Sequence, residues 1–237
     1  MTKGIIYYTD NRLASPLADI VRTQLQTIGL PIVSVSLAPL PGFGTNVHLP
    51  LQRGYVAYFQ QILTALETST AEVVFFCEHD VLYPLSHFAF TPEHTNTFYY
   101  NLNIWKVRAT DGFAVKTDDC KQVSGICVDR MTAVTHYQER NTYVREHGYQ
   151  QNMGFEPFTH KRISWPTRYR AGSWKSPDPL VDVRHEGTLS RSRWSPTEFR
   201  NQCYTRGWTE STCPEWACPL LSPLFKRVPH DNPSASL

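Results

Sequence analysis

A short apolar segment that ends in three ionisable side chains is the feature that most constrains the fold. Residues 73–77 are apolar, and a run of this length and composition predicts a strand buried on both faces, as in parallel sheets covered by helices. Glu78, His79 and Asp80 follow at once. Because ionisable groups are costly to place at the end of a buried strand, we expect the cluster to bind a cation or to take part in chemistry. A helix cap or a solvated turn is the alternative.

The segments before this strand alternate between strand and helix patterns. Residues 4–9 predict a first strand, and apolar residues at helical spacing from 17 to 28 predict a helix that Gly29 ends. Residues 31–37 predict a second strand, 39–50 a Pro/Gly loop, and Arg53 with Gly54 the start of a second helix. The order strand–helix–strand–helix–strand predicts a parallel sheet with crossover helices. The expected apolar face of the second helix comprises Val56, Phe59, Ile62, Leu63 and Leu66.

The pattern changes after residue 87. Residues 98–107 predict two strands with a turn, 121–128 another strand, and 130–147 a helix. From about residue 158 onward Pro, Trp and Arg dominate with little periodicity. This composition indicates a loop-rich extension packed on the same domain. We therefore expect a single α/β domain over residues 1–194, with a mixed, mainly parallel central sheet and flanking helices, and a C-terminal extension over 195–237.

Bulk properties exclude some classes of protein. A chain of 237 residues with 41% hydrophobic residues suits one sizeable globular domain. No apolar run is long enough to cross a bilayer and the N-terminus lacks a signal pattern, so we expect a cytoplasmic protein without a transmembrane segment. A net charge of +2 does not by itself indicate nucleic-acid binding. Lys and Arg are nevertheless concentrated between residues 161 and 206, among Trp and Tyr side chains that suit sugar rings, stacked bases or phosphates.

The six cysteines are expected to be thiols in a cytosolic protein. Cys77 and Cys127 lie in apolar surroundings and are predicted core residues. Cys203, Cys213 and Cys218 gather near the C-terminus, but their spacing lacks the paired C-x2-C of common zinc sites, so a structural zinc ion is disfavoured.

In its strand-first half, its acidic motif at the end of a central strand and its mixed second half, the chain resembles the GT-A fold of nucleotide-sugar glycosyltransferases up to about Trp194. Many of those enzymes carry Asp-x-Asp where this chain has Glu-His-Asp. The run EHDVLY, the Gly-Phe-Glu-Pro segment at 154–157 and the late Arg-His pair at 184–185 also resemble compact glycosyltransferase-like proteins of phages and environmental bacteria.

The resemblance implies a metal site. Asp80 would bind the ion, and Glu78 would help directly, through water or through the ribose of the donor. His185 would complete the metal shell, with Asp182 in a position to orient it; a surface histidine with ordinary hydrogen-bond partners is the alternative. Mn²⁺ or Mg²⁺ is expected, and a histidine ligand favours Mn²⁺.

The resemblance also implies a site for a nucleoside-diphosphate sugar, most simply a UDP-sugar. Thr9, Asp10 and Asn11 would meet the base and ribose, although an ordinary turn explains the last two equally well. Arg53 would face the nucleotide or its diphosphate together with the helix N-terminus, and a solvated side chain is the alternative. The expected donor contacts are completed by Glu78, His79, Ser124 and Gly125, the last because glycine permits close backbone approach.

Glu156 is the expected base of an inverting transfer, taking the proton from the acceptor hydroxyl; a helix N-terminal carboxylate is the alternative. The acceptor would be a saccharide or a hydroxymethylated pyrimidine in DNA, as in phage DNA glycosylation. Two other functions stay open: nucleotidyl transfer, which the absence of a Gly-rich phosphate loop at residues 9–16 disfavours, and non-catalytic binding of nucleotides or nucleic acid.

Overall fold

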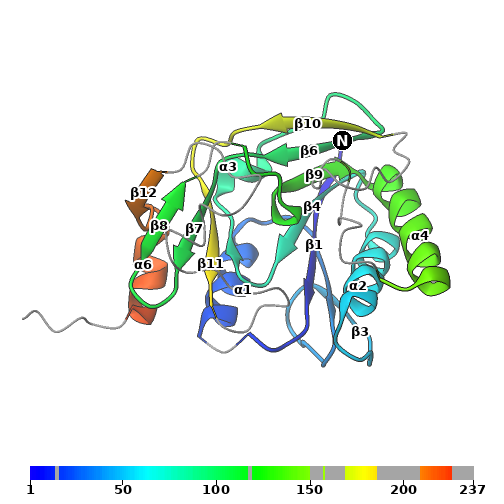
Figure 1. The fold of residues 1–237 in the computed structure, drawn as a ribbon, viewed down its shortest axis with the longest axis horizontal. Helices are drawn as coiled ribbons and strands as arrows, with labels where there is room; N and C mark the ends of the chain where they lie inside the picture. Colours follow the sequence, from blue (N-terminus) through cyan, green and yellow to red (C-terminus); the bar gives the residue numbers. More distant parts are fainter. Residues whose placement is uncertain (14–15, 117–118, 150–156, 158–168, 186–208, 226–237) are drawn as a thin grey trace, which may run out of the picture.

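The computed structural model describes residues 1–13, 16–116, 119–149, 157, 169–185 and 209–225. Figure 1 shows a layered α/β arrangement in which helices cover a central sheet and a second sheet lies beside it. The expected α/β class, with a mixed central sheet and flanking helices, is confirmed. The boundary between residues 194 and 195 lies outside the described residues, and the predicted division there stays a prediction.

The N-terminal part forms the parallel half of the central sheet. Its elements are β1 (Lys3–Thr9), α1 (Leu17–Thr27), β2 (Ile32–Ser36), β3 (Thr45–His48), α2 (Tyr55–Thr68) and β4 (Val73–Glu78). Strand β1 lies between β2 and β4 and is parallel to both, and β3 extends the sheet beyond β2 in the same direction. The predicted crossover order is therefore confirmed.

Two expectations for this half need correction. The stretch 39–50 was expected to be a loop, yet it contains β3, because its backbone pairs with β2 at the sheet edge although its side chains are half-buried or exposed. On α2, Phe59, Ile62, Leu63 and Leu66 are buried as expected. Val56 is 51% exposed because it lies in the first turn of the helix, where Ala57 and not Val56 packs inward.

The central sheet continues through an antiparallel strand. The added elements are η1 (Val123–Gly125), β9 (Ile126–Asp129), α4 (Arg130–His147), β6 (Thr97–Asn101) and β10 (Arg170–Trp174). The full order is β10-β6-β9-β4-β1-β2-β3, in which β9 is antiparallel to both of its neighbours. The sheet is thus mixed and mainly parallel, as expected, and α4 has the predicted bounds.

Local sequence explains where α4 begins and ends. The carboxylate of Asp129 accepts a hydrogen bond from the backbone N–H of Thr132 at 2.8 Å, which caps the first turn. Gly148, with a φ of 74°, ends the helix in a positive-φ backbone conformation that glycine adopts at low steric cost.

A second sheet of five strands was not expected. Its members are β5 (Val81–Leu82), β7 (Ile104–Arg108), β8 (Phe113–Lys116), β11 (Leu180–Arg184) and β12 (Thr209–Thr212), in the order β12-β8-β7-β11-β5. The remaining short elements are α3 (Leu85–Phe88), α6 (Cys218–Leu221) and η2 (Ser222–Leu224). The expectation of a loop-rich region after residue 158 is wrong for β10, β11 and β12, because each pairs with a strand far away in the sequence.

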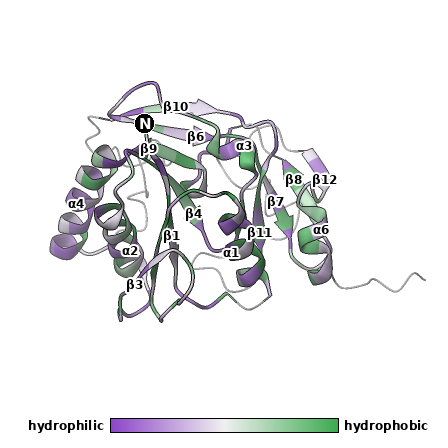
Figure 2. Ribbon diagram, turned by 180° about the vertical axis from the view of Figure 1, so that it is seen from behind, coloured by the Kyte–Doolittle hydropathy of each residue, from purple (hydrophilic) through white to green (hydrophobic). Residues whose placement is uncertain are grey.

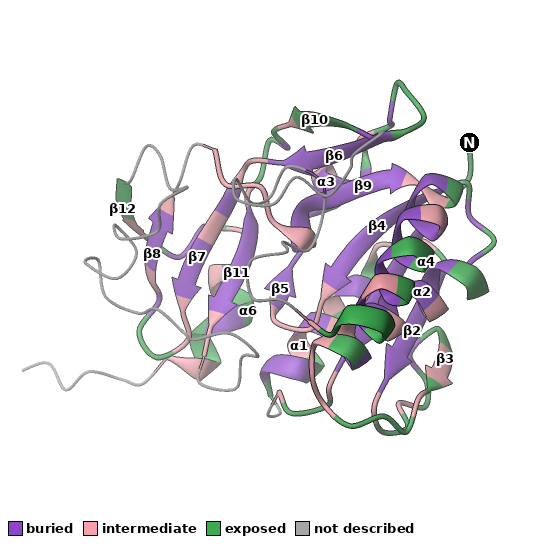
Figure 3. Ribbon diagram, turned by 45° about the vertical axis from the view of Figure 1, so that its right-hand side comes forward, coloured by how far each residue is buried: buried purple, intermediate pink, exposed green. Residues whose placement is uncertain are grey.

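The central sheet separates two apolar clusters. One joins α1, the inner face of β1 and β4, and the second sheet, and the other lies under α2 and α4. Figure 3 shows that the strands of the central sheet are mostly buried and that the outer sides of α2 and α4 are exposed. Figure 2 shows that hydrophobic residues lie along strands of both sheets. Cys77 and Cys127 are fully buried, which confirms that they are core residues. Among the described helices, none is long and apolar enough to cross a membrane.

Candidate metal centre and donor site

The candidate site lies where β1, β2 and β4 end. Parallel strands place their carboxyl ends at one edge, which is where open α/β sheets bind ligands. Tyr8 pairs with Glu78 at this edge, so the residues after each strand lie side by side. Beyond Glu78 the chain turns at His79 and Asp80, and β5 then begins. Glu78 is thus the last residue of β4, and His79 and Asp80 form the turn that follows it.

The second sheet brings His185 to the same place. Strand β11 is antiparallel to β5, with Val181 opposite Leu82. The backbone N–H of Val183 donates to the carbonyl of Asp80 at 2.9 Å, which extends the pairing toward the turn. The next residues of β11 therefore lie beside the turn, and Nε2 of His185 is 3.4 Å from Oδ2 of Asp80.

Three side chains converge into a candidate metal site. Ligand atoms of His79, Asp80 and His185 all lie within 4.8 Å of one another. Two imidazole nitrogens and one carboxylate oxygen suit Mn²⁺ and related transition ions better than Mg²⁺, which prefers oxygen ligands. The residues present thus fit a divalent cation. Glu78 is not part of this group; its backbone N–H donates to the hydroxyl of Tyr83 at 2.9 Å, and its own role at the metal stays a prediction.

The charges around Asp80 favour its ionised form. Burial opposes ionisation, but His185, whose Nε2 is 3.4 Å away, and the nearby His79 and Arg184 outweigh it and hold the pKa of Asp80 below its ordinary value. The pKa of Asp182, on β11, is instead raised above its ordinary value, because burial disfavours the charged form. Its carboxylate accepts a hydrogen bond from Arg184 at 2.8 Å. Its expected role in orienting His185 stays a prediction.

The residues after β1 form a bonded turn beside this group. Nε of Arg53 donates to Oδ2 of Asp10 at 2.5 Å, and the N–H of Arg12 donates to Oδ1 at 3.0 Å. Burial disfavours the charge on Asp10, yet these bonds outweigh it and lower its pKa. Asn11 has a φ of 60°, and its Oδ1 accepts from the N–H of Ala38 at 2.8 Å. The structure therefore joins Arg53 to Asp10 next to the metal group, and contact of these residues with a donor stays a prediction.

The 3₁₀ turn η1 lies next to β4. Strands β9 and β4 are antiparallel, with Phe75 opposite Cys127, so the chain before β9 runs alongside the end of β4. The hydroxyl of Ser124 is fully buried and has no hydrogen-bond partner among the described residues, which is uncommon for a buried polar group. Gly125 is needed for packing, since an added Cβ would lie 3.0 Å from the carbonyl of Asn101. This close approach is to β6, and the expected contact of Gly125 with the donor stays a prediction.

Glu156 lies outside the described residues. Its neighbour Pro157 is described, and the Pro157 carbonyl accepts a hydrogen bond from the hydroxyl of Tyr100 on β6 at 2.6 Å. The role of Glu156 as base stays a prediction.

Sequence reasoning missed Gln61, and it expected His79 to contact the donor, whereas the structure brings His79 into the candidate metal group. Nε2 of Gln61 donates to the carbonyls of Thr9 at 2.7 Å and Val35 at 3.2 Å, and so joins the ends of β1 and β2. A signal was present, because Gln61 lies one turn from both Ala57 and Ala65 on the buried stripe of α2. A polar side chain on a buried helix face is expected to form hydrogen bonds inside the protein.

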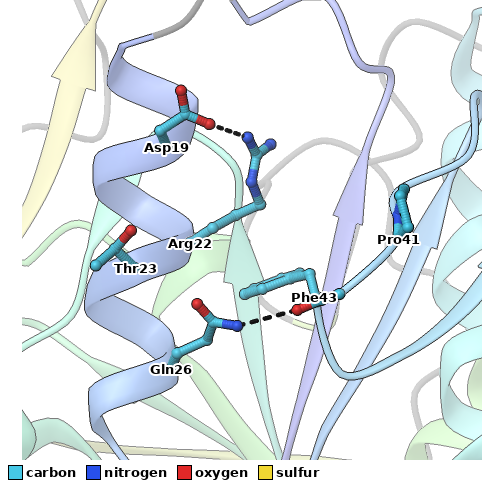
Figure 4. A pocket seen from close by; sticks show the side chains of 7 residues that line it. Asp19, Arg22, Thr23, Gln26, Pro41 and Phe43 are labelled. Carbon is cyan, nitrogen blue, oxygen red and sulfur yellow. Dashed lines mark hydrogen bonds and ion pairs between the residues drawn. The ribbon is translucent and has the colours of Figure 1, made fainter.

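A separate small hollow lies between α1 and the chain before β3. Figure 4 shows Arg22 turned toward Asp19, while Nε2 of Gln26 donates to the carbonyl of Gly42 at 3.1 Å. None of the predicted site residues lines this hollow.

Comparison with known proteins finds similarity among solved structures only. No protein-family model matches the chain, and no curated protein matches it. Among solved structures, the chain is similar to a glycosyltransferase involved in the glycosylation of the major capsid of PBCV-1. The sequence identity is 10%, the alignment covers 77% of this chain and 92% of the other, and the TM-score is 0.47.

Proposed function

We propose that this protein is a metal-dependent glycosyltransferase that moves a sugar from a nucleoside-diphosphate sugar to an acceptor hydroxyl. The observation that carries the proposal is the convergence of His79, Asp80 and His185 at the carboxyl edge of a mainly parallel sheet. A divalent ion at this edge suits a diphosphate leaving group. The buried hydroxyl of Ser124 beside β4 offers a hydrogen-bonding group for the donor.

The proposed reaction breaks the bond between the sugar C1 and the diphosphate oxygen and forms a bond from C1 to the acceptor oxygen. An ion held by His79, Asp80 and His185 would supply charge neutralisation for the departing diphosphate. The negative charge of Asp80, which its neighbours favour, suits this task. Glu156 takes the proton of the acceptor hydroxyl, and attack of the acceptor oxygen on the face of C1 opposite the diphosphate gives inversion.

We further propose Mn²⁺ as the preferred ion and a UDP-sugar as the donor. The two histidines of the metal group support the choice of ion. Thr9, Asp10, Asn11 and Arg53 lie next to the metal group, at the edge where a nucleotide would extend from its diphosphate.

The acceptor is proposed to be a saccharide or a hydroxymethylated pyrimidine in DNA. The salt dependence of acceptor binding separates the two. Binding of DNA weakens steeply as salt rises, because phosphate contacts release counterions, whereas binding of a neutral saccharide changes little.

Calorimetry with a panel of nucleoside diphosphates, each with and without Mn²⁺, tests the proposed class. We expect one nucleotide to bind in a Mn²⁺-dependent manner, and the matching nucleotide sugars then serve as donors in a transfer assay. Metal-independent nucleotide affinity without transfer would support non-catalytic binding instead. Release of pyrophosphate from a nucleoside triphosphate would support nucleotidyl transfer.

A further inference from the structure

The hydroxyl of Thr9 contacts the ring of a proposed metal ligand. Oγ1 of Thr9 lies 2.8 Å from Nδ1 of His79. We propose that Thr9 is a positioning residue, whose hydroxyl holds Nδ1 so that Nε2 of His79 is the atom that binds the metal with Asp80 and His185. The inference rests on the metal centre of the proposed function, and it replaces the expected contact of Thr9 with the donor.

The hydrogen bonds around Nδ1 of His79 support this assignment. Oγ1 of Thr9 also accepts a hydrogen bond from the N–H of Asn11 at 3.0 Å. Oδ1 of Asp10 lies 3.7 Å from the same Nδ1. Two oxygen atoms therefore face Nδ1. A neutral imidazole has one protonated nitrogen and one with a free lone pair, and metal-binding histidines commonly hold the nitrogen away from the metal in a hydrogen bond. With Nδ1 held by Thr9, Nε2 is left for the ion.

Thr9 is suited to this task because its own position is fixed. It is the last residue of β1 and is 5% exposed. Its carbonyl accepts hydrogen bonds from Nε2 of Gln61 at 2.7 Å and from the N–H of Leu37 at 3.3 Å. The adjacent Asp10 is joined to Arg53 at the start of α2. Because these hydrogen bonds fix the backbone at Thr9, its hydroxyl can restrict the ring of His79 to one orientation.

The test is Mn²⁺ binding to the full chain, followed by electron paramagnetic resonance without nucleotide or acceptor. Thr9→Val keeps the shape of the side chain and removes the hydroxyl, and Thr9→Ser restores the hydroxyl. Thr97→Val is the matched control, because Thr97 is also a buried threonine in a strand of the central sheet, and its hydroxyl donates to the carbonyl of Thr95 at 3.2 Å.

We expect Thr9→Val to weaken Mn²⁺ binding about tenfold to a hundredfold and to reduce the nitrogen coupling seen by electron spin-echo spectroscopy from two histidines to one. Thr9→Ser and Thr97→Val should behave like the unaltered protein. A merely structural role of Thr9 would not remove the coupling of one histidine selectively. If Thr9→Val does not fold, Thr9→Ala replaces it in the same assay, and the same losses of Mn²⁺ affinity and of one histidine coupling are expected.

The inference is overturned if Thr9→Val binds Mn²⁺ with unchanged affinity and two nitrogen couplings. An Asp80→Ala variant keeps that failure apart from failure of the proposed function. If Asp80→Ala abolishes binding while Thr9→Val has no effect, the metal centre stands and only the positioning role falls. If the unaltered protein binds no Mn²⁺, both proposals are wrong.

Discussion

The two sheets contribute to the candidate site in different ways. The central sheet supplies His79 and Asp80 from a turn between β4 and β5, with Thr9 from the neighbouring β1. The second sheet supplies His185 from the end of β11, a strand far along the chain that reaches the turn only by pairing with β5. One side of the site is therefore built from strands and helices that follow one another, and the other side from a long-range pairing. The candidate metal group therefore forms where the two sheets meet.

The largest expected effect is the loss of catalysis when the central sheet's carboxylate is removed. Asp80→Ala should lower transfer by about a thousandfold or more, because several kcal/mol of charge stabilisation are lost with the metal. A steady-state transfer assay measures this. Asp178→Ala is the control, because the carboxylate of Asp178 accepts a hydrogen bond from the hydroxyl of Ser86 and is not part of the metal group. Near-normal turnover in Asp80→Ala would show that the carboxyl edge of the central sheet is not the reactive site.

The second prediction asks whether the two sheets fold as one unit. Phe75 on β4 belongs to the same apolar cluster as Val107 and Val183 of the second sheet. Phe75→Ala should lower the free energy of unfolding by about 3–5 kcal/mol through cavity formation, within a single transition seen by urea titration. Val56→Ala, at an exposed position, should change it by less than about 0.5 kcal/mol. Two separate transitions in Phe75→Ala would show that the sheets are independent.

The third prediction compares the two histidines. His79→Ala and His185→Ala should each weaken Mn²⁺ binding by at least about tenfold, since each removes one ligand from a three-residue group. His147→Ala, at the exposed end of α4, should have no effect. Titration calorimetry with Mn²⁺ measures all three. If only His79→Ala weakened binding, the second sheet would have no part in the metal centre.

The central sheet was largely predictable from the sequence, whereas the second sheet was not. Apart from β3, the order of strands and helices through residue 78 was predictable, because each element carries its own apolar period. The helix at Arg130–His147 was also predicted with its bounds, although its apolar period is weak. Strands β11 and β12 were not, because short strands that pair with distant segments leave no local signal. His185 was found through the resemblance to glycosyltransferases, and its strand was missed.

The same reasoning applies to individual side chains. The cluster at 78–80 was found because charge directly after an apolar strand is unusual. The assignment within it was not predictable, because the turn at His79 and Asp80 decides which side chains converge, and a turn type depends on the strand that follows. The sequence therefore indicated the cluster, whereas the convergence of His79 with Asp80 and His185 is visible only in the structure. The expected role of Glu78 at the metal stays a prediction.

The smallest expected effect is a change in the stability of the second sheet. In the β7–β8 hairpin the hydrogen bond from Arg108 lowers the pKa of Asp111. A carboxyl with a lowered folded-state pKa stabilises the protein above its ordinary pKa, and this contribution is lost as pH falls through the lowered value. Asp111→Asn should therefore cost a few tenths of a kcal/mol at pH 7, about the value of a partly exposed ion pair. Urea unfolding at neutral and strongly acidic pH measures it. The same deficit at both pH values would contradict the expected loss of stabilisation in acid.

The most direct test of the metal centre is a crystal structure with Mn²⁺ and a nucleoside diphosphate, recorded at a wavelength where manganese scatters anomalously. The account predicts one strong anomalous peak in contact with His79, Asp80 and His185, with the diphosphate bound to the same ion. An ordered nucleotide without such a peak, or a peak held by other residues, would contradict it.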